Sequence, residues 1–258
     1  ISAFVRMSAT IVMPVYAQQF NLSASFVGLI SGMYFIPYAC IQLLSGPLCR
    51  RFGVGSTVIV FLCLGIAGLL FMAFAQNGFM VLCGRFLMGL GMGPVFVATV
   101  SILQKYYSGA EYVRVYSLAI LLSNLGSALA SAPLKFIVEH FGIKNLFFSV
   151  AFVVLICIFI FKYVSRDDEK QKDDSAMVKD VFGTLKRAYK TVSSYYVLKC
   201  GILFWIFHSS AMLVYQGLWS TKWAAVAFPA FERFSGWTGT VASIGVMFAC
   251  FMGDAFGK

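Results

Sequence analysis

Eight long apolar stretches follow one another along the chain. Each is about 20 residues long, which is the length that an α-helix needs to cross a bilayer core of about 30 Å, and each carries few or no charges. They cover residues 1–18, 25–47, 56–75, 79–103, 115–138, 145–163, 196–218 and 237–253. The pattern predicts an all-α, polytopic membrane protein. Because the first stretch begins abruptly and the last stops at Lys258, we expect the chain to be cut at both ends.

A single long polar segment separates six of these stretches from the last two. It opens with SRDDEKQKDDSA, a run too charged to form a packed core. Its second half places apolar residues at helical spacing among basic ones, which predicts either an amphipathic helix on the inner leaflet or a solvated linker helix. The apolar set is Val178, Phe182, Leu185, Tyr189 and Val192. We therefore expect a six-helix half over 1–164, a linker over 165–194 and the start of a second half over 195–258.

Composition and charge placement agree with a membrane protein. The chain is 60% hydrophobic and 12% charged, against roughly a quarter charged in soluble domains. Its formal net charge is +10, but the basic residues gather in the loops after the second, fourth and sixth stretches. The positive-inside rule places those loops in the cytoplasm, with the linker 165–194 among them. We expect a multi-pass protein of the cell inner membrane, with the bilayer rather than nucleic acid as its surroundings.

The end of the second stretch carries a glycine-rich and arginine-rich turn, Gly46-Pro-Leu-Cys-Arg50-Arg51-Phe-Gly53. This turn resembles the signature loop of the major facilitator superfamily in its two glycines and in Arg51. Arg50 stands where the family usually has an aspartate. A second, shorter copy near the C-terminus keeps an aspartate, Asp254.

Two further stretches resemble motifs of the same family. In the fourth, Arg85 is followed by spaced glycines that include Gly89 and Gly93, and glycines let another helix approach closely in lipid. Arg85 could pin helices together, serve the function directly, or extend to the outer surface. The fifth stretch has a surface of small residues that ends in Pro133. The resemblance implies two six-helix halves, of which about four helices are missing here, and alternating access around a midplane site.

Arg6 is a lone cation inside the first stretch. Thirteen residues separate it from Gln19, or about 20 Å at ~1.5 Å per residue, so it lies within the hydrocarbon. Such a cation is costly and needs a partner. It is either the ligand of an anionic substrate or a structural arginine bonded to backbone carbonyls. An arginine eight residues before Pro14 in the first helix also resembles superfamily members that carry organic anions.

Other polar side chains on the predicted helices complete the candidate site. Ser31, Tyr34, Tyr38 and Gln42 share one face of the second stretch. His208 is either a carrier of a coupling proton or a neutral core residue. The substrate-binding candidates are Arg6, Tyr34, Tyr38, Gln42, Asn124, His208, Tyr215 and Gln216. Since no carboxylate lies away from the helix ends, an anion or a neutral polar solute fits better than a cation.

The sequence contains none of the common motifs of nucleotide-binding proteins, hydrolases or metalloproteases. There is no GxxxxGK[ST] phosphate loop, GxSxG elbow or HExxH pair, so we expect no enzyme activity. The seven cysteines form no CxxC pair, and we expect no metal and no cofactor. The prediction is a monomeric secondary transporter of a small polar solute, favoured to be an organic anion, with H⁺ or Na⁺ coupling open. The alternative is a non-transporting sensor or partner protein on the same scaffold.

Overall fold

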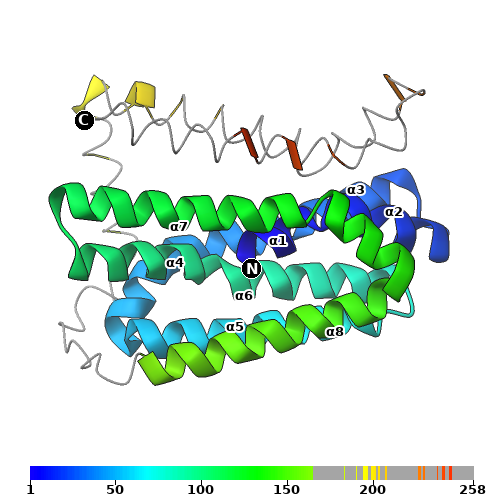
Figure 1. Ribbon diagram of the computed structural model, residues 1–258, viewed down its shortest axis with the longest axis horizontal. Coiled ribbons are helices and arrows are strands. Elements are labelled where there is room, and N and C mark those ends of the chain that lie inside the picture. The colour runs from blue at the N-terminus through cyan, green and yellow to red at the C-terminus, as the bar shows by residue number, and fades with distance from the viewer. Residues whose placement is uncertain are drawn as a thin grey trace.

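Helices make up nearly all of the computed structural model, which describes residues 1–164, 183, 190, 194–196, 199–201, 203, 207, 226–227, 229, 237, 240–241 and 244–245. The helices are α1 (Ser2–Met7), α2 (Ala9–Gln19), α3 (Ala24–Met33), α4 (Phe35–Phe52), α5 (Val54–Ala73), α6 (Gly78–Tyr106), α7 (Gly109–Leu129) and α8 (Ala132–Val164). They lie roughly parallel or antiparallel in one bundle (Figure 1). The expected amphipathic helix of the linker and nearly all of the stretches 196–218 and 237–253 lie outside the described residues.

The first six predicted stretches are all helical. By length and apolar composition, five helical segments of the described part can cross a bilayer: Ala24–Phe52, Val54–Ala73, Gly78–Tyr106, Gly109–Leu129 and Ala132–Tyr163. The boundary predicted between the fifth and sixth stretches falls at Gly142, which has φ +78° and interrupts α8. The fold is therefore the helical membrane bundle that the sequence predicts.

Three of the predicted stretches contain a local interruption of the helix. The first is divided at Ser8 into α1 and α2, and the second at Tyr34 into α3 and α4. Both residues keep right-handed helical backbone angles, φ −58° and ψ −22° at Ser8 and φ −64° and ψ −40° at Tyr34. The break at Tyr34 has a local cause, because Pro37 in the first turn of α4 has no N–H for the carbonyl four residues earlier. The fifth stretch starts earlier, at Gly109, and is interrupted between Leu129 and Ala132.

Glycines set the position of α6 at the centre of the bundle. On one side of α6, a Cβ added to Gly91 would collide with the backbone of Gly65 in α5. On another side, a Cβ on Gly89 would collide with the carbonyl of Tyr34, and one on Gly93 would meet the side chain of Ile41. Bare backbone therefore lets α6 approach α5 and the α3–α4 helix at once, as the sequence predicts for this motif.

The signature turn joins α4 to α5. Gly53 has φ +83°, a backbone conformation that favours glycine. The hydroxyl of Thr57 lies 2.8 Å from the carbonyl oxygen of Gly53 and 3.2 Å from that of Leu48. A Cβ on Gly46 would meet nothing within 4 Å, so of the two glycines only Gly53 is required by the local geometry.

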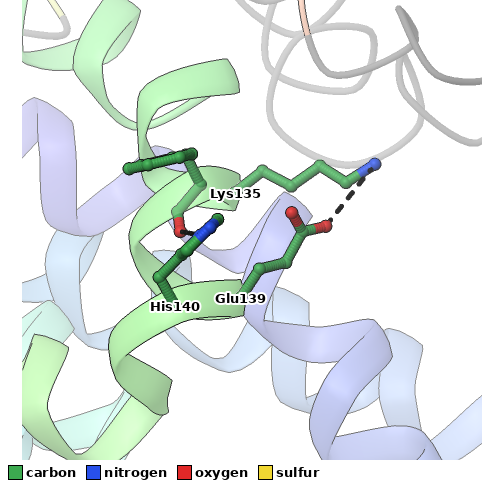
Figure 2. Close-up of polar contacts among 4 residues, drawn as sticks. Lys135, Glu139 and His140 are labelled. Atoms are coloured by element: carbon green, nitrogen blue, oxygen red, sulfur yellow. Dashed lines mark hydrogen bonds and ion pairs between the residues drawn. The ribbon is translucent and has the colours of Figure 1, made fainter.

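A small polar group lies on α8 shortly before the interruption at Gly142. Figure 2 shows the Lys135 side chain reaching toward Glu139, with Nζ 4.0 Å from Oε1. Nδ1 of His140 lies 2.9 Å from the carbonyl oxygen of Phe136 (Figure 2). Lys135 and Glu139 are largely exposed, and pairs of this kind contribute at most about 1 kcal/mol. The group is an exposed surface feature.

Candidate functional site

A cavity of about 410 Å³ lies among α1, α4, α6 and α7. Its polar lining comes from all four helices: Ser2, Arg6, Tyr38, Thr99, Tyr116, Ser123, Asn124 and Ser127. Val95, Phe96, Ile120 and Leu122 are among the apolar residues of the wall. Arg6 carries the only ionised side chain among the described residues that line the cavity, and none of them is acidic. The cavity is therefore small, partly polar and positively charged.

Arg6 reaches this cavity from α1. Its side chain is half-buried, and its Nε is buried with no hydrogen-bond partner in the part of the chain that the structure describes. Leaving a buried donor unpaired costs roughly 1–3 kcal/mol, and more for a charged group. The Nε of Arg85 is unpaired in the same way, so the feature that distinguishes Arg6 is its place in the cavity lining.

Arg85 lies deeper and is bonded to the backbone. It is completely buried, so the possibility that it extends to the outer surface is wrong. Its Nη1 donates to the carbonyl of Val5 and its Nη2 to the carbonyl of Ser31, both at 3.3 Å. Its guanidinium carbon lies 4.8 Å from the ring centroid of Tyr34, within the range of a cation–π contact. This geometry joins α6 to α1 and α3, as expected of an arginine that pins helices together.

Tyr34 and Tyr38, which the sequence predicts on one helix face, differ in their distance from the cavity. Tyr38 lines the cavity, whereas Tyr34 is completely buried, and its hydroxyl has no hydrogen-bond partner among the described residues. The two rings stack at 5.5 Å between centroids with 23° between their planes. Gln42 is half-buried and lies outside the cavity wall. The expected row on one face is therefore split, with only Tyr38 facing the candidate site.

α6 and α7 supply five of the polar residues in the cavity lining: Thr99, Tyr116, Ser123, Asn124 and Ser127. Asn124 uses its Nδ2 to donate to the carbonyl of Ile120 at 3.0 Å. Thr99 donates its hydroxyl to the carbonyl of Val95 at 2.8 Å. The sequence interpretation included Asn124 but missed Thr99 and Tyr116. Tyr116 could have been found from helical spacing, since it lies four, seven and eight residues before other wall positions of α7.

The remaining candidates lie elsewhere. The turn residues Arg50 and Arg51 are exposed, and Arg51 lies over the ring of its neighbour Phe52 at 5.1 Å. Pro133 is in the first turn of α8, next to the interruption after α7. The predicted site residues His208, Tyr215 and Gln216 and the motif residue Asp254 lie outside the described residues. The structure thus brings together Arg6, Tyr38 and Asn124 of the original candidates.

Known proteins with similar sequences are transporters. A family model described as Major Facilitator Superfamily matches residues 1–258. The uncharacterized transporter YybO of Bacillus subtilis (strain 168) is 24% identical over 170 residues, 66% of this chain and 39% of that protein. The probable sulfoacetate transporter SauU of Cupriavidus necator is 24% identical over 163 residues, 63% of this chain and 38% of that protein.

The multidrug resistance protein MdtL of Escherichia coli O81 (strain ED1a) is 27% identical over 154 residues, 58% of this chain and 39% of that protein. In all three comparisons the matched region spans less than two fifths of the length of the relative.

Proposed function

The chain belongs to the major facilitator superfamily, and from this premise we propose that the protein is a secondary transporter that carries a small organic anion across the cytoplasmic membrane. Arg6 carries the proposal: an arginine in a membrane helix, facing a cavity, with a buried Nε that has no hydrogen-bond partner among the described residues. Ionisable side chains that face a cavity inside membrane helices mark substrate pathways. Rocking of two helical halves would expose the site to each side in turn.

The charge of the cavity supports an anion as the substrate. With Arg6 in its wall and no acidic side chain among the described lining residues, the cavity attracts negative charge in a medium of low dielectric constant. The planar guanidinium group matches carboxylate, sulfonate and phosphate oxygens. One relative, SauU, is described as a probable sulfoacetate transporter, and sulfoacetate is an organic anion.

The other wall residues receive supporting roles in this proposal. Tyr38 and Tyr116 would donate hydroxyl hydrogen bonds to the substrate, and Asn124 would donate the second N–H of its Nδ2, since Ile120 uses only one of the two. A coupling ion, H⁺ or Na⁺, would accompany transport, with His208 as the candidate proton carrier. The end of the bundle with Arg50 and Arg51 would face the cytoplasm.

Uptake into proteoliposomes tests the proposal. The full-length protein would be assayed with a panel of small carboxylates, sulfonates and phosphate esters. We expect saturable uptake of an anion, lowered about a hundredfold in kcat/KM by Arg6→Ala, because removing one partner of a buried charged hydrogen bond costs about 2–5 kcal/mol. Arg6→Lys keeps the charge and should retain part of the uptake with a raised KM. Lys135→Ala, in the exposed ion pair, is the matched control and should stay within twofold of wild type.

The outcomes separate the alternatives. Uptake that is unchanged in correctly folded Arg6→Ala would show that Arg6 is not the anion ligand. Binding of an anion without flux would favour the non-transporting sensor. Transport of drugs alone would favour a function like that of MdtL, a multidrug resistance protein.

A further inference from the structure

A buried aromatic ring lies between Arg85 and the cavity wall. The guanidinium carbon of Arg85 lies 4.8 Å from the ring centroid of Tyr34. Tyr34 in turn stacks on Tyr38, which lines the cavity. Val5, whose carbonyl is bonded to Arg85, directly precedes Arg6. Arg85 therefore lies one layer of side chains behind the cavity wall.

Among the described residues, no carboxylate balances the charges of Arg6 and Arg85. The partners of Arg85 are two backbone carbonyls and an aromatic ring, all of which are neutral. The acidic residues of the described part are Glu111 and Glu139, and both are exposed. Neutral groups solvate a buried cation but do not cancel its charge, and buried charges are normally paired. The region around Tyr34 thus carries two positive charges.

We propose that Arg85, in addition to bonding α1 and α3 to α6, supplies a second positive charge to the cavity and thereby selects doubly charged small anions over singly charged anions of the same size. The inference rests on the proposed function, since it specifies the substrate of the same cavity. Arg6 would contact the anion, while Arg85 would act through the field, because its completely buried side chain does not reach the cavity wall. Charges act over such distances when little water lies between them.

The size of the cavity agrees with this substrate class. A volume of about 410 Å³ lies near the lower end of the range for small-molecule sites. It holds a dianion of two to four carbon atoms together with a few water molecules. The hydroxyl and amide groups of the wall would bind the second charged group of the anion, for which the described residues offer no second cation in the wall.

A pair of anions that differ only in charge tests the inference. Uptake of radiolabelled sulfoacetate by the full-length protein in proteoliposomes would be inhibited either by unlabelled sulfoacetate or by its carboxamide, which has the same number of heavy atoms and one charge fewer. We expect the inhibition constant of the dianion to be at least tenfold lower. Malonate and its monoamide form a second pair without the sulfonate and should give the same preference.

Two variants of Arg85 then test whether its charge causes the preference for the dianion. Arg85→Gln keeps hydrogen-bond donors but loses the charge, and it should reduce the preference to about threefold or less. Arg85→Lys keeps the charge and should keep most of the preference. The ratio of two inhibition constants on one preparation does not depend on the fraction of active protein. If Arg85→Gln fails to insert, the wild-type ratios for both anion pairs still decide on the preference, and Arg85→Met, which is uncharged and similar in length, decides on the charge.

The results distinguish the two proposals. Equal inhibition by the dianion and the amide would overturn the charge selection and leave anion transport in place. A full preference retained by Arg85→Gln would overturn the role of Arg85. Uptake of none of the anions would instead contradict the proposed function.

Discussion

The Nη1 of Arg85 donates a hydrogen bond of 3.3 Å to the carbonyl oxygen of Val5, the residue before Arg6. Its Nη2 does the same for Ser31. Val5 lies three residues before the break at Ser8, and Ser31 lies three residues before the break at Tyr34. Carbonyls near a helix break lose regular partners and need other donors. One side chain of α6 therefore stabilises the interruptions in both neighbouring membrane helices.

The glycine contacts of α6 give a first prediction. Gly91→Ala should lower the stability of the bundle by about 1–3 kcal/mol, because its Cβ would collide with the backbone of Gly65, which cannot rotate away. Gly28→Ala is the matched control, since nothing lies within 4 Å of its Cβ position in α3. Thermal unfolding in detergent measures both. Equal midpoints for the two variants would contradict the close approach of α5 and α6.

The contact between Tyr34 and Arg85 gives a second prediction. Tyr34→Phe keeps the ring under the guanidinium group and removes a buried hydroxyl with no described partner, so stability should stay the same or rise slightly. Tyr34→Leu removes the ring and should cost about 1–2 kcal/mol more than Tyr34→Phe, the expected range for a desolvated cation–π contact. Chemical denaturation of both variants in detergent compares them. If Tyr34→Phe lost more stability than Tyr34→Leu, the hydroxyl group rather than the ring would be the stabilising part, and the prediction would be wrong.

Thr240 gives a third prediction, at the interruption between α7 and α8. Its hydroxyl lies 3.2 Å from the carbonyl of Ala128, to which it donates, and it accepts from the N–H of Ala132 at 3.4 Å. Thr240→Val keeps the shape and loses both bonds, so the protein should be destabilised by about 1–3 kcal/mol. Thr240→Ser keeps the hydroxyl and should lose less. Midpoints that fall equally for both variants would point to packing rather than hydrogen bonding.

Much of the fold could be predicted from apolar length and glycine spacing. The six stretches within residues 1–164 are helical, because a bilayer core fixes helix length and every backbone group must be bonded within the helix. The glycines after Arg85 also pack as expected. The break at Ser8 was not predictable, because the carbonyl of Val5 accepts from Ser8 and from Arg85, eighty positions away.

The candidate site was predicted only in part. Arg6 and Arg85 look alike in the sequence, as single cations within apolar helices. Only the rotation of each helix against its neighbours decides which arginine faces a cavity and which is bonded to carbonyls. The same rotation separates Tyr38 from Tyr34 and brings Thr99 into the wall. Helical spacing predicts which residues share one face of a helix, but it does not predict which neighbouring helix or cavity that face contacts.

Protection of a cysteine in the cavity tests the central claim most directly. Thr99→Cys would be introduced into a full-length variant without the native cysteines, after its uptake activity is confirmed, and labelled with a small methanethiosulfonate reagent. We predict that a saturating transported anion slows labelling at least fivefold, and that Arg6→Ala removes this protection. Labelling at the same rate with and without an anion that the protein transports would contradict the assignment of this cavity as the substrate site.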